Sequence, residues 1–391
     1  MKKTLQTLAL SMLVATSAAA TDFLDDGSLK VTGFYSLTGA KVLSGSVKGS
    51  SEPWTYMNWK CPCTIQTWEY AAAYEREKGW QFDQESLVGV QIRKEFSPTL
   101  SATAQLVSRS NNPTYGSRPT LDWAYMTWQP SADSAWTVQA GRFRIPLYYY
   151  SDYLYIGYAY PWVRPMPDVY GWPIYAYNGA NLTYRTQLGS TDWAATFHGW
   201  TGGYTQKNDA YDTIIYWGDS THESWKDILG GYVAANNGVI DVRAMMMTYK
   251  DSTWQEDAQG NRSYLLQVQD QKTRIMGLSV NMDYKNWLVK TEVDRYLQTD
   301  DVKGLNNIYK YALFSVGYQF GNWTPMYSQS RYRTVASPIE GRDTRYVSLR
   351  WDFAKNTALK VQYDISNDKT EYDYPFFGNS KLVSVSLQGV F

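Results

Sequence analysis

The sequence predicts an all-β protein, a transmembrane up-and-down antiparallel β-barrel of about 16 strands. Apolar and polar residues alternate with a period of two along most of the chain, as in strands with one lipid-facing side. The connections between the alternating segments are short and long in strict turn. Tyrosine (34) and tryptophan (17) are abundant although mean hydropathy is negative. A barrel of alternating strands with aromatic girdles at both membrane interfaces would be polar on average and yet rich in tyrosine and tryptophan.

The first element is a predicted secretory signal peptide over residues 1–20. Lys2 and Lys3 precede an apolar stretch, and Ala18 and Ala20 form a small-residue cleavage motif. The alternative is an amphipathic N-terminal helix of a cytosolic protein. The apolar stretch is too short to span a membrane as a helix, and no run of 18 or more apolar residues follows it. We therefore expect residues 21–391 to form one barrel domain.

The alternating segments define the predicted strands. They cover residues 29–35, 86–96, 100–109, 121–127, 136–141, 181–185, 193–200, 228–235, 239–248, 276–282, 289–295, 314–320, 326–333, 347–353, 359–365 and 382–391. The short connections are 97–99, 130–134, 186–191, 236–238, 284–286, 321–322 and 354–356, and the long ones are 40–84, 111–120, 144–176, 201–225, 250–271, 298–307, 335–342 and 367–380. A β-sandwich or a propeller would not place its long loops on every second connection.

The last strand runs to the end of the chain. One of its faces is apolar and consists of Val383, Val385, Leu387 and Phe391. Its other face is polar and consists of Ser384, Ser386 and Gln388. Because lipid offers no hydrogen-bond partners to the backbone, a spanning sheet must close on itself. We therefore expect the final strand to pair with the first, near residues 30–35.

These features together resemble the Gram-negative general-porin superfamily, over the whole chain after the signal peptide. The shared features are the signal peptide, about 16 strands, a long third loop and a C-terminal phenylalanine. The resemblance implies a passive diffusion channel for small hydrophilic solutes and ions in the outer membrane, surrounded by lipid and lipopolysaccharide. It also implies a homotrimer, a third loop (144–176) folded into the pore, and recognition by the barrel-assembly machinery. The residues that match this assembly signal are Val383, Val385, Leu387 and Phe391.

Charged residues on the inward parity of the strands are candidates for the pore lining. In the porin superfamily, acidic groups on the third loop face basic groups on the early strands. Alternation places Lys30, Arg93, Arg109 and Asp122 inward, and the third loop carries Asp152, Arg164 and Asp168. Late strands add Arg331, Arg333 and Arg350, a candidate anion-attracting side, whereas Arg345 has lipid-side parity. The family's short acidic loop motif is absent. The alternative is that these charges form ordinary salt-bridged networks in the barrel wall.

The third loop is rich in aromatic residues. They include Tyr148, Tyr149, Tyr150, Tyr153, Tyr155, Trp162 and Trp172. They suggest a stacking track for sugars or organic acids, and hence a substrate-selective channel. The alternative is that the rings pack the loop against the barrel wall.

The remaining features weigh against other classes of protein. Basic and acidic residues balance at 37 each, so no net charge attracts nucleic acid. Cys61 and Cys63 are close enough in the sequence to form a disulfide. A metal site would need more ligands than their neighbourhood offers, because His198 and His222 are the only histidines in the sequence. No Ser or Asp partner can be placed beside His198, so we expect no enzyme and no cofactor. A barrel acting as a receptor or adhesin, with a plugged lumen, is a further alternative.

Overall fold

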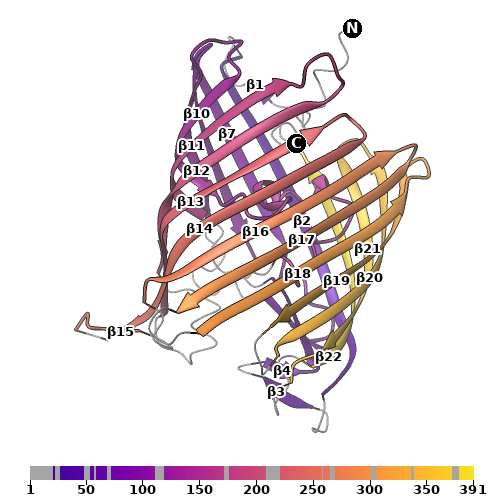
Figure 1. Cartoon of the computed structure of the whole chain (residues 1–391). Coiled ribbons are helices and arrows are strands. Elements are labelled where there is room, and N and C mark those ends of the chain that lie inside the picture. The colour runs from indigo at the N-terminus through magenta and orange to yellow at the C-terminus, as the bar shows by residue number, and fades with distance from the viewer. Residues whose placement is uncertain are drawn as a thin grey trace.

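The computed structural model describes residues 21–22, 27–47, 53–56, 59–67, 72–110, 119–170, 176–207, 221–257, 259–264, 269–300, 305–335, 339–371 and 378–391. Within these ranges 16 strands form one closed antiparallel barrel (Figure 1). They are β2 (Leu29–Ser46), β7 (Leu87–Ser97), β8 (Leu100–Arg109), β9 (Thr120–Trp128), β10 (Trp136–Arg144), β11 (Ala176–Gln187), β12 (Ala194–Gln206), β13 (Thr221–Asn236), β14 (Ile240–Glu256), β16 (Gln271–Tyr284), β17 (Trp287–Asp300), β18 (Leu305–Tyr318), β19 (Trp323–Thr334), β20 (Gly341–Ala354), β21 (Thr357–Asp368) and β22 (Asn379–Val390).

Shorter elements lie outside this set. β1 (Thr21–Asp22) pairs with the start of β2, and β15 (Arg262–Tyr264) pairs antiparallel with the last residues of β14. The first long connection contains β3 (Trp54–Tyr56), β4 (Trp59–Cys61), β5 (Cys63–Thr67), β6 (Ala72–Glu75) and the 3-10 helix η2 (Arg76–Lys78). No helix among the described residues is long and apolar enough to cross a membrane.

The barrel closes as the sequence predicts. β22 pairs with β2 from Phe34↔Val390 to Ser46↔Asn379, and β2 pairs on its other edge with β7. The predicted strand number and order are confirmed, but many strands extend further at the end that carries the long connections. We call this the loop end and the opposite end the turn end. Beyond the lipid an outward side chain need not be apolar, so alternation is lost in the sequence while strand pairing continues, as in β14 up to Glu256.

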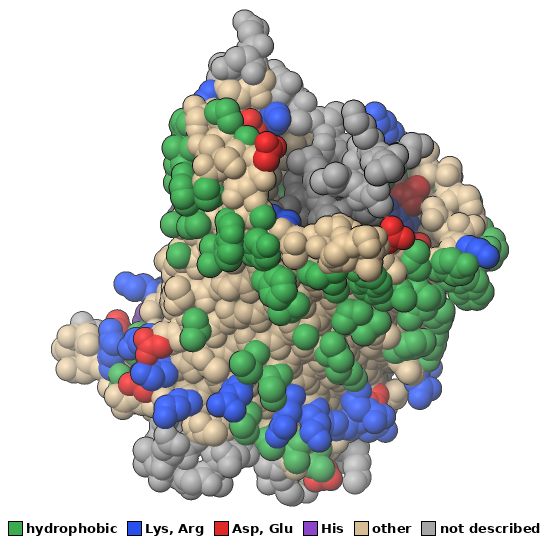
Figure 2. Space-filling model, turned by 45° about the horizontal axis from the view of Figure 1, so that its top comes forward, with side chains coloured by type: hydrophobic (Ala, Val, Ile, Leu, Met, Phe, Trp, Pro, Cys, Tyr) green, Lys and Arg blue, Asp and Glu red, His purple; other side chains and the backbone are tan. Residues whose placement is uncertain are grey.

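The two faces of the wall differ as lipid requires. The inward side chains of β22 are small and polar, as Ser384 and Ser386 show, and several other strands turn aromatic side chains inward. Outward side chains form an apolar band (Figure 2). At the turn end, outward aromatic residues form a girdle that we call the turn-end girdle. It includes Tyr284, Trp287, Tyr318, Trp323, Trp351 and Phe353. The Trp323 and Trp351 rings are stacked across neighbouring strands with centroids 5.0 Å apart. Aromatic rings in this position mark the membrane interface.

Candidate functional site

The third long connection lies against the inner side of the barrel wall. Its described part, residues 145–170, contains two 3-10 helices, η3 (Ser151–Tyr153) and η4 (Gly157–Ala159). Prolines fix φ and remove backbone donors, while tyrosine rings fill volume. A segment rich in both is therefore held mainly by side-chain contacts with its surroundings. Those contacts reach inward-facing residues of strands on the far side of the barrel.

Lys360 is the main anchor of this connection. It lies on the inner face of β21 and its side chain is completely buried. Its ammonium group donates hydrogen bonds to the carbonyl oxygens of Gly157 (2.6 Å), Tyr160 (2.5 Å) and Trp162 (2.9 Å). An ammonium has three donors, so all of them are used, and three loop carbonyls are satisfied at one point.

Two arginines hold other parts of the same backbone. Arg350 on β20 donates to the carbonyl oxygen of Tyr158 at 2.8 Å and forms an ion pair with Asp352 at 2.7 Å. Arg243 on β14 donates to the carbonyl oxygen of Tyr148 at 3.2 Å. The connection is thus fixed from β14 on one side to β21 on the other.

Arg164 joins the third connection to the first one. Its guanidinium forms ion pairs with Glu85 (2.6 Å) and Asp364 (3.5 Å), and it donates to the Ser384 hydroxyl at 2.9 Å. Burial is the largest single influence and would lower the pKa of Arg164, but Glu85, Tyr74 and Asp364 together outweigh burial and raise it. Glu85 also accepts a hydrogen bond from the Tyr74 hydroxyl at 2.7 Å. Arg164 is therefore engaged on every side by the protein itself.

Asp168 and Asp122 are also paired. Asp168 forms an ion pair with the buried Arg342 of β20 and accepts a hydrogen bond from Ser330 at 2.6 Å. Asp122 forms a buried ion pair with Arg144 at 2.8 Å. The guanidinium of Arg144 lies 4.0 Å from the centre of the Tyr155 ring, and Arg109 lies 4.2 Å from the same ring. These charges hold the third connection against the wall.

Most of the aromatic residues of the third connection are buried. Tyr148, Tyr150 and Trp162 belong to a large hydrophobic cluster inside the barrel. The Trp162 indole donates to Ser328 at 2.9 Å, and the Tyr148 and Tyr296 hydroxyls are 2.6 Å apart. Tyr149 and Tyr153 are only partly buried. Trp172 lies outside the described residues.

The basic wall expected from the sequence divides in two. Lys30 and Arg93 share the half-exposed Glu95 at the turn end of the lumen, at 3.9 and 3.4 Å. The structure corrects the expectation for Arg331 and Arg333. Both alternate with the buried, inward Ser328 and Ser330, so they lie on the outer face of β19. There they pair with Asp343 of β20 at 3.0 and 2.9 Å.

A cavity of about 230 Å³ lies beside the third connection on the turn-end side. It is lined by acidic and basic side chains together with tyrosines. The charged ones are Asp152, Arg185, Asp241, Arg243, Asp283 and Lys290. Burial raises the pKa of Asp152, and the nearby Arg243 and Arg144 partly oppose that rise. Opposed charges along a narrow polar passage create a transverse field that orients dipolar solutes.

Sequence reasoning missed several of the residues that position this site. Arg243, Arg342 and Lys360 each hold the third connection, and the sequence analysis did not single them out. The sequence does indicate that these side chains face inward, because each stands at a polar position of a strongly alternating strand. A lysine at mid-strand with inward parity must find partners inside the barrel, but parity does not say which ones.

The C-terminal residue closes the barrel at the turn end. Gly33 donates to the Phe391 carbonyl at 2.7 Å, and Phe391 donates to the Gly33 carbonyl at 2.9 Å. The Phe391 ring lies over Gly33 on the outer face, where a Cβ atom would be only 2.2 Å from the ring. Val383, Val385 and Leu387 alternate with buried Ser384 and Ser386 on the same strand, so they share this outer face.

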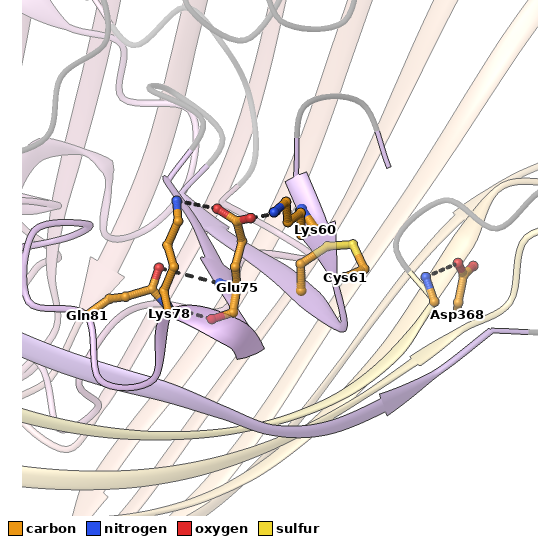
Figure 3. The surroundings of a disulfide bond; sticks show 8 residues. Lys60, Cys61, Glu75, Lys78, Gln81 and Asp368 are labelled. Carbon is orange, nitrogen blue, oxygen red and sulfur yellow. Dashed lines mark hydrogen bonds and ion pairs between the residues drawn. A yellow bond between two sulfur atoms is a disulfide. The ribbon is translucent and has the colours of Figure 1, made fainter. Parts of the chain in front are cut away.

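The first long connection carries the cysteine pair. Cys61 and Cys63 are both buried and form a disulfide with Cα atoms 4.2 Å apart. Beside it, Glu75 pairs with Lys78 and accepts a hydrogen bond from the backbone amide of Lys60 at 2.8 Å (Figure 3). The pair is therefore part of a compact substructure at the loop end.

The histidines lie apart from these contacts. His198 is buried on the inner face of β12, and its Nδ1 is 2.8 Å from the Thr183 hydroxyl. Across the described part of the chain, no group of three or more His, Cys, Asp or Glu side chains is arranged to hold a metal ion.

No family model and no curated protein matches the sequence. Among solved structures, OmpF of Salmonella typhi in complex with daunomycin is similar, with a TM-score of 0.57, 14% identity and coverage of 95% of this chain and 100% of that chain. The anion-selective porin of Comamonas acidovorans has a TM-score of 0.56 and 12% identity, covering 93% and 99%. The trimer form of OmpT of Vibrio cholerae has a TM-score of 0.53 and 8% identity, covering 93% and 99%.

At these identities the similarity concerns the fold. It extends over almost the whole of each chain, and it agrees with the closure of β22 on β2 and with the alternation of polar inner and apolar outer faces. The chain has the closed 16-stranded barrel fold of the Gram-negative outer-membrane porins.

Proposed function

We propose that this chain is a non-enzymatic porin, a channel for passive diffusion of small hydrophilic solutes and ions across the outer membrane. The observation that carries the proposal is the charged cavity beside an anchored third connection. Asp152 of that connection faces the same cavity as Arg243 and Lys290 of the wall. Such an arrangement lets polar solutes pass while pore width and charge select among them.

The third connection would then narrow the pore and keep its width constant. Lys360, Arg350 and Arg243 hold its carbonyl groups. Its own Arg164 and Asp168 side chains are held by Glu85 and Arg342. A passage bordered in this way should conduct less than a wide general porin. The charges of both signs favour small zwitterionic or strongly dipolar solutes.

A substrate-selective channel is the second candidate. It is favoured by Tyr149 and Tyr232, whose rings line the same cavity as the charges. The buried Tyr148, Tyr150 and Trp162 support the packing role for the rest of the aromatic residues.

The assembly of the protein belongs to the same proposal. Residues 1–20 would be removed during export, and Val383, Val385, Leu387 and Phe391 would be read by the barrel-assembly machinery in the outer membrane. A homotrimer is proposed because one of the structures with this fold is a trimer form.

The test is single-channel recording of the refolded protein in a planar bilayer under a salt gradient, with and without sugars, amino acids and organic acids. Ohmic conductance steps that occur in groups of three and are unchanged by the added solutes would support the diffusion channel and the trimer. Small steps blocked by one class of solute would favour the selective channel. Correctly folded barrels without any conductance would refute both and leave the receptor or adhesin.

A further inference from the structure

One side of the barrel carries outward-facing basic residues near its loop end. We call this set the basic belt. It consists of Lys272 and Arg274 on β16, Arg295 on β17, Lys310 on β18, Arg331 on β19 and Arg345 on β20, all of them exposed. Figure 2 shows a row of basic side chains beneath the apolar band on this face.

The belt brings like charges directly opposite one another. Arg295 is paired in register with Lys310, and Lys310 is paired with Arg333 on its other side. Like charges in directly opposite positions destabilise a sheet unless an anion lies between them. Asp343 neutralises only the β19 part, where it pairs with Arg331 and Arg333.

Most of the belt has no acidic partner among the residues that the structure describes. Within the described ranges, Arg274, Arg295, Lys310 and Arg345 form no ion pair. An anion from outside the chain would satisfy them. Arginine and lysine side chains are well suited to phosphate oxygens, which arginine can bind with two parallel hydrogen bonds.

The belt lies at a constant distance from the turn-end girdle. On four successive strands the basic residue is eight positions from an aromatic one. The pairs are Trp287 and Arg295, Tyr318 and Lys310, Trp323 and Arg331, and Phe353 and Arg345. Eight residues extend about 26 Å along a strand, or about 20 Å in height at a tilt of about 40°. With the girdle at one membrane interface, the belt is therefore level with the headgroups of the opposite leaflet.

The opposite side of the barrel lacks such a belt. On β8 to β12, the described outward residues near the loop end include one basic side chain, Arg142. Its guanidinium lies 4.5 Å from the centre of the Tyr204 ring and donates to the Leu121 carbonyl at 3.0 Å. Near the loop end, β16 to β20 thus carry more outward-facing basic side chains than β8 to β12 do.

We propose that the basic belt binds the phosphate groups of a phosphorylated glycolipid of the outer leaflet, of the lipopolysaccharide class. The acyl chains of this lipid lie on the apolar band that adjoins the belt on its turn-end side, where Val293, Phe314 and Val347 are exposed. A soluble anion would use the charges alone, whereas a lipid uses the charges and the adjoining apolar wall together. The inference rests on the proposed function only in placing the loop end at the outer leaflet, and it does not require an open pore.

The test compares two lipids on the full-length refolded protein in detergent. One is bisphosphorylated lipid A, and the other is the same molecule with both phosphates removed. Retained lipid is counted by native mass spectrometry. The belt variant combines Arg274→Gln, Arg295→Gln, Lys310→Gln and Arg345→Gln. The control removes the same charge elsewhere, with Lys285→Gln, Lys355→Gln, Lys369→Gln and Lys381→Gln. Circular dichroism and the heat-modifiable gel shift show that each variant is folded.

The wild type and the control should retain the phosphorylated lipid, and the belt variant should retain it at least ~10-fold more weakly. The dephosphorylated lipid should bind all three proteins equally weakly. Equal retention by the belt variant and the wild type would overturn the proposal, as would equal binding of the two lipids. Displacement of the lipid by inorganic phosphate alone would show a soluble-anion site instead. Conductance of the belt variant, measured in parallel, separates this result from the proposed channel function.

Discussion

The ammonium group of Lys360 on β21 donates a hydrogen bond to the carbonyl oxygen of Trp162 in the third connection, at 2.9 Å. The two residues are 198 positions apart, so this contact ties the two halves of the chain together across the lumen. A fully buried ammonium is costly unless all its donors are paired, which makes the position of this loop segment well defined.

The first prediction concerns this anchor. Lys360→Met keeps the apolar stem but removes the donors, leaving three loop carbonyls to find water or remain unpaired, at a cost of about 1–3 kcal/mol. Open-channel current noise should rise and the heat-modifiable band should unfold at a lower temperature. Lys355→Met, in the exposed turn after β20, is the control and should change neither. Unaltered noise and unfolding temperature in Lys360→Met would show that the loop is held by other contacts.

The second prediction concerns Asp152, whose pKa is raised by burial. As pH falls from neutral, Asp152 takes up a proton before exposed acids do, because an exposed aspartate has a pKa of about 3.9. The cavity then loses a negative charge, so anion preference should rise. Reversal potentials between about pH 4 and pH 8 would record this shift, which Asp152→Asn should abolish and Asp133→Asn, in a turn, should leave intact.

The raised pKa of Asp152 also makes the stability of the folded protein depend on pH. The folded state binds the Asp152 proton more tightly than the unfolded chain does. Asp152 therefore adds most to the free energy of unfolding below the unfolded pKa of about 3.9. Its contribution falls as pH rises from there through the raised folded pKa. Asp152→Asn should therefore be relatively more stable than the wild type at neutral pH than at acid pH. A difference in urea midpoint that is independent of pH would contradict this account.

The third prediction concerns the ion pair between Glu85 and Arg164. Arg164→Met leaves buried Glu85 and Asp364 without their cation and should cost about 3–5 kcal/mol of unfolding free energy. A double-mutant cycle with Glu85→Gln, measured by urea unfolding in lipid vesicles, should give a coupling of about 1–3 kcal/mol. The matched control is the half-exposed pair of Lys30 and Glu95, where coupling should be about 0–1 kcal/mol. Equal coupling at the two sites would refute the importance of burial.

The fourth prediction concerns the contact of Phe391 with Gly33. Gly33→Ala places a methyl group against the ring, so refolding yield into vesicles should fall, with a cost of about 1–3 kcal/mol. Phe391→Ala removes the obstacle, so the double variant should refold better than Gly33→Ala alone. Leu387 lies on the same face but is paired with Leu37, so Leu387→Ala should give no such rescue. Simple additivity of Gly33→Ala and Phe391→Ala would mean that the two side chains do not interact.

The barrel could be predicted from the sequence because lipid imposes a simple rule on each strand. Val347, Leu349 and Trp351 had to face outward and Ser348 inward, whatever the rest of the chain did. The strand ends were less predictable, since outward residues beyond the lipid obey no such rule. Thr221–Asn236 and Ile240–Glu256 therefore extend well past the predicted limits.

The contacts of the third connection could not be read from alternation. Arg342 and Arg350 have the same inward parity on β20, yet one binds the Asp168 carboxylate and the other binds the Tyr158 carbonyl. Which partner each arginine meets depends on the path of the loop, and no local pattern encodes that path. For Arg331 and Arg333 the parity was decisive but was not applied, and they lie outside with Asp343.

The closure of β22 on β2 joins serine hydroxyls that are 350 positions apart, those of Ser36 and Ser386. A chain that lacks β2 or β22 cannot close the sheet, so it leaves two strand edges unpaired. Both β2 and β22 are therefore needed before every strand of the wall has its backbone hydrogen bonds satisfied in lipid.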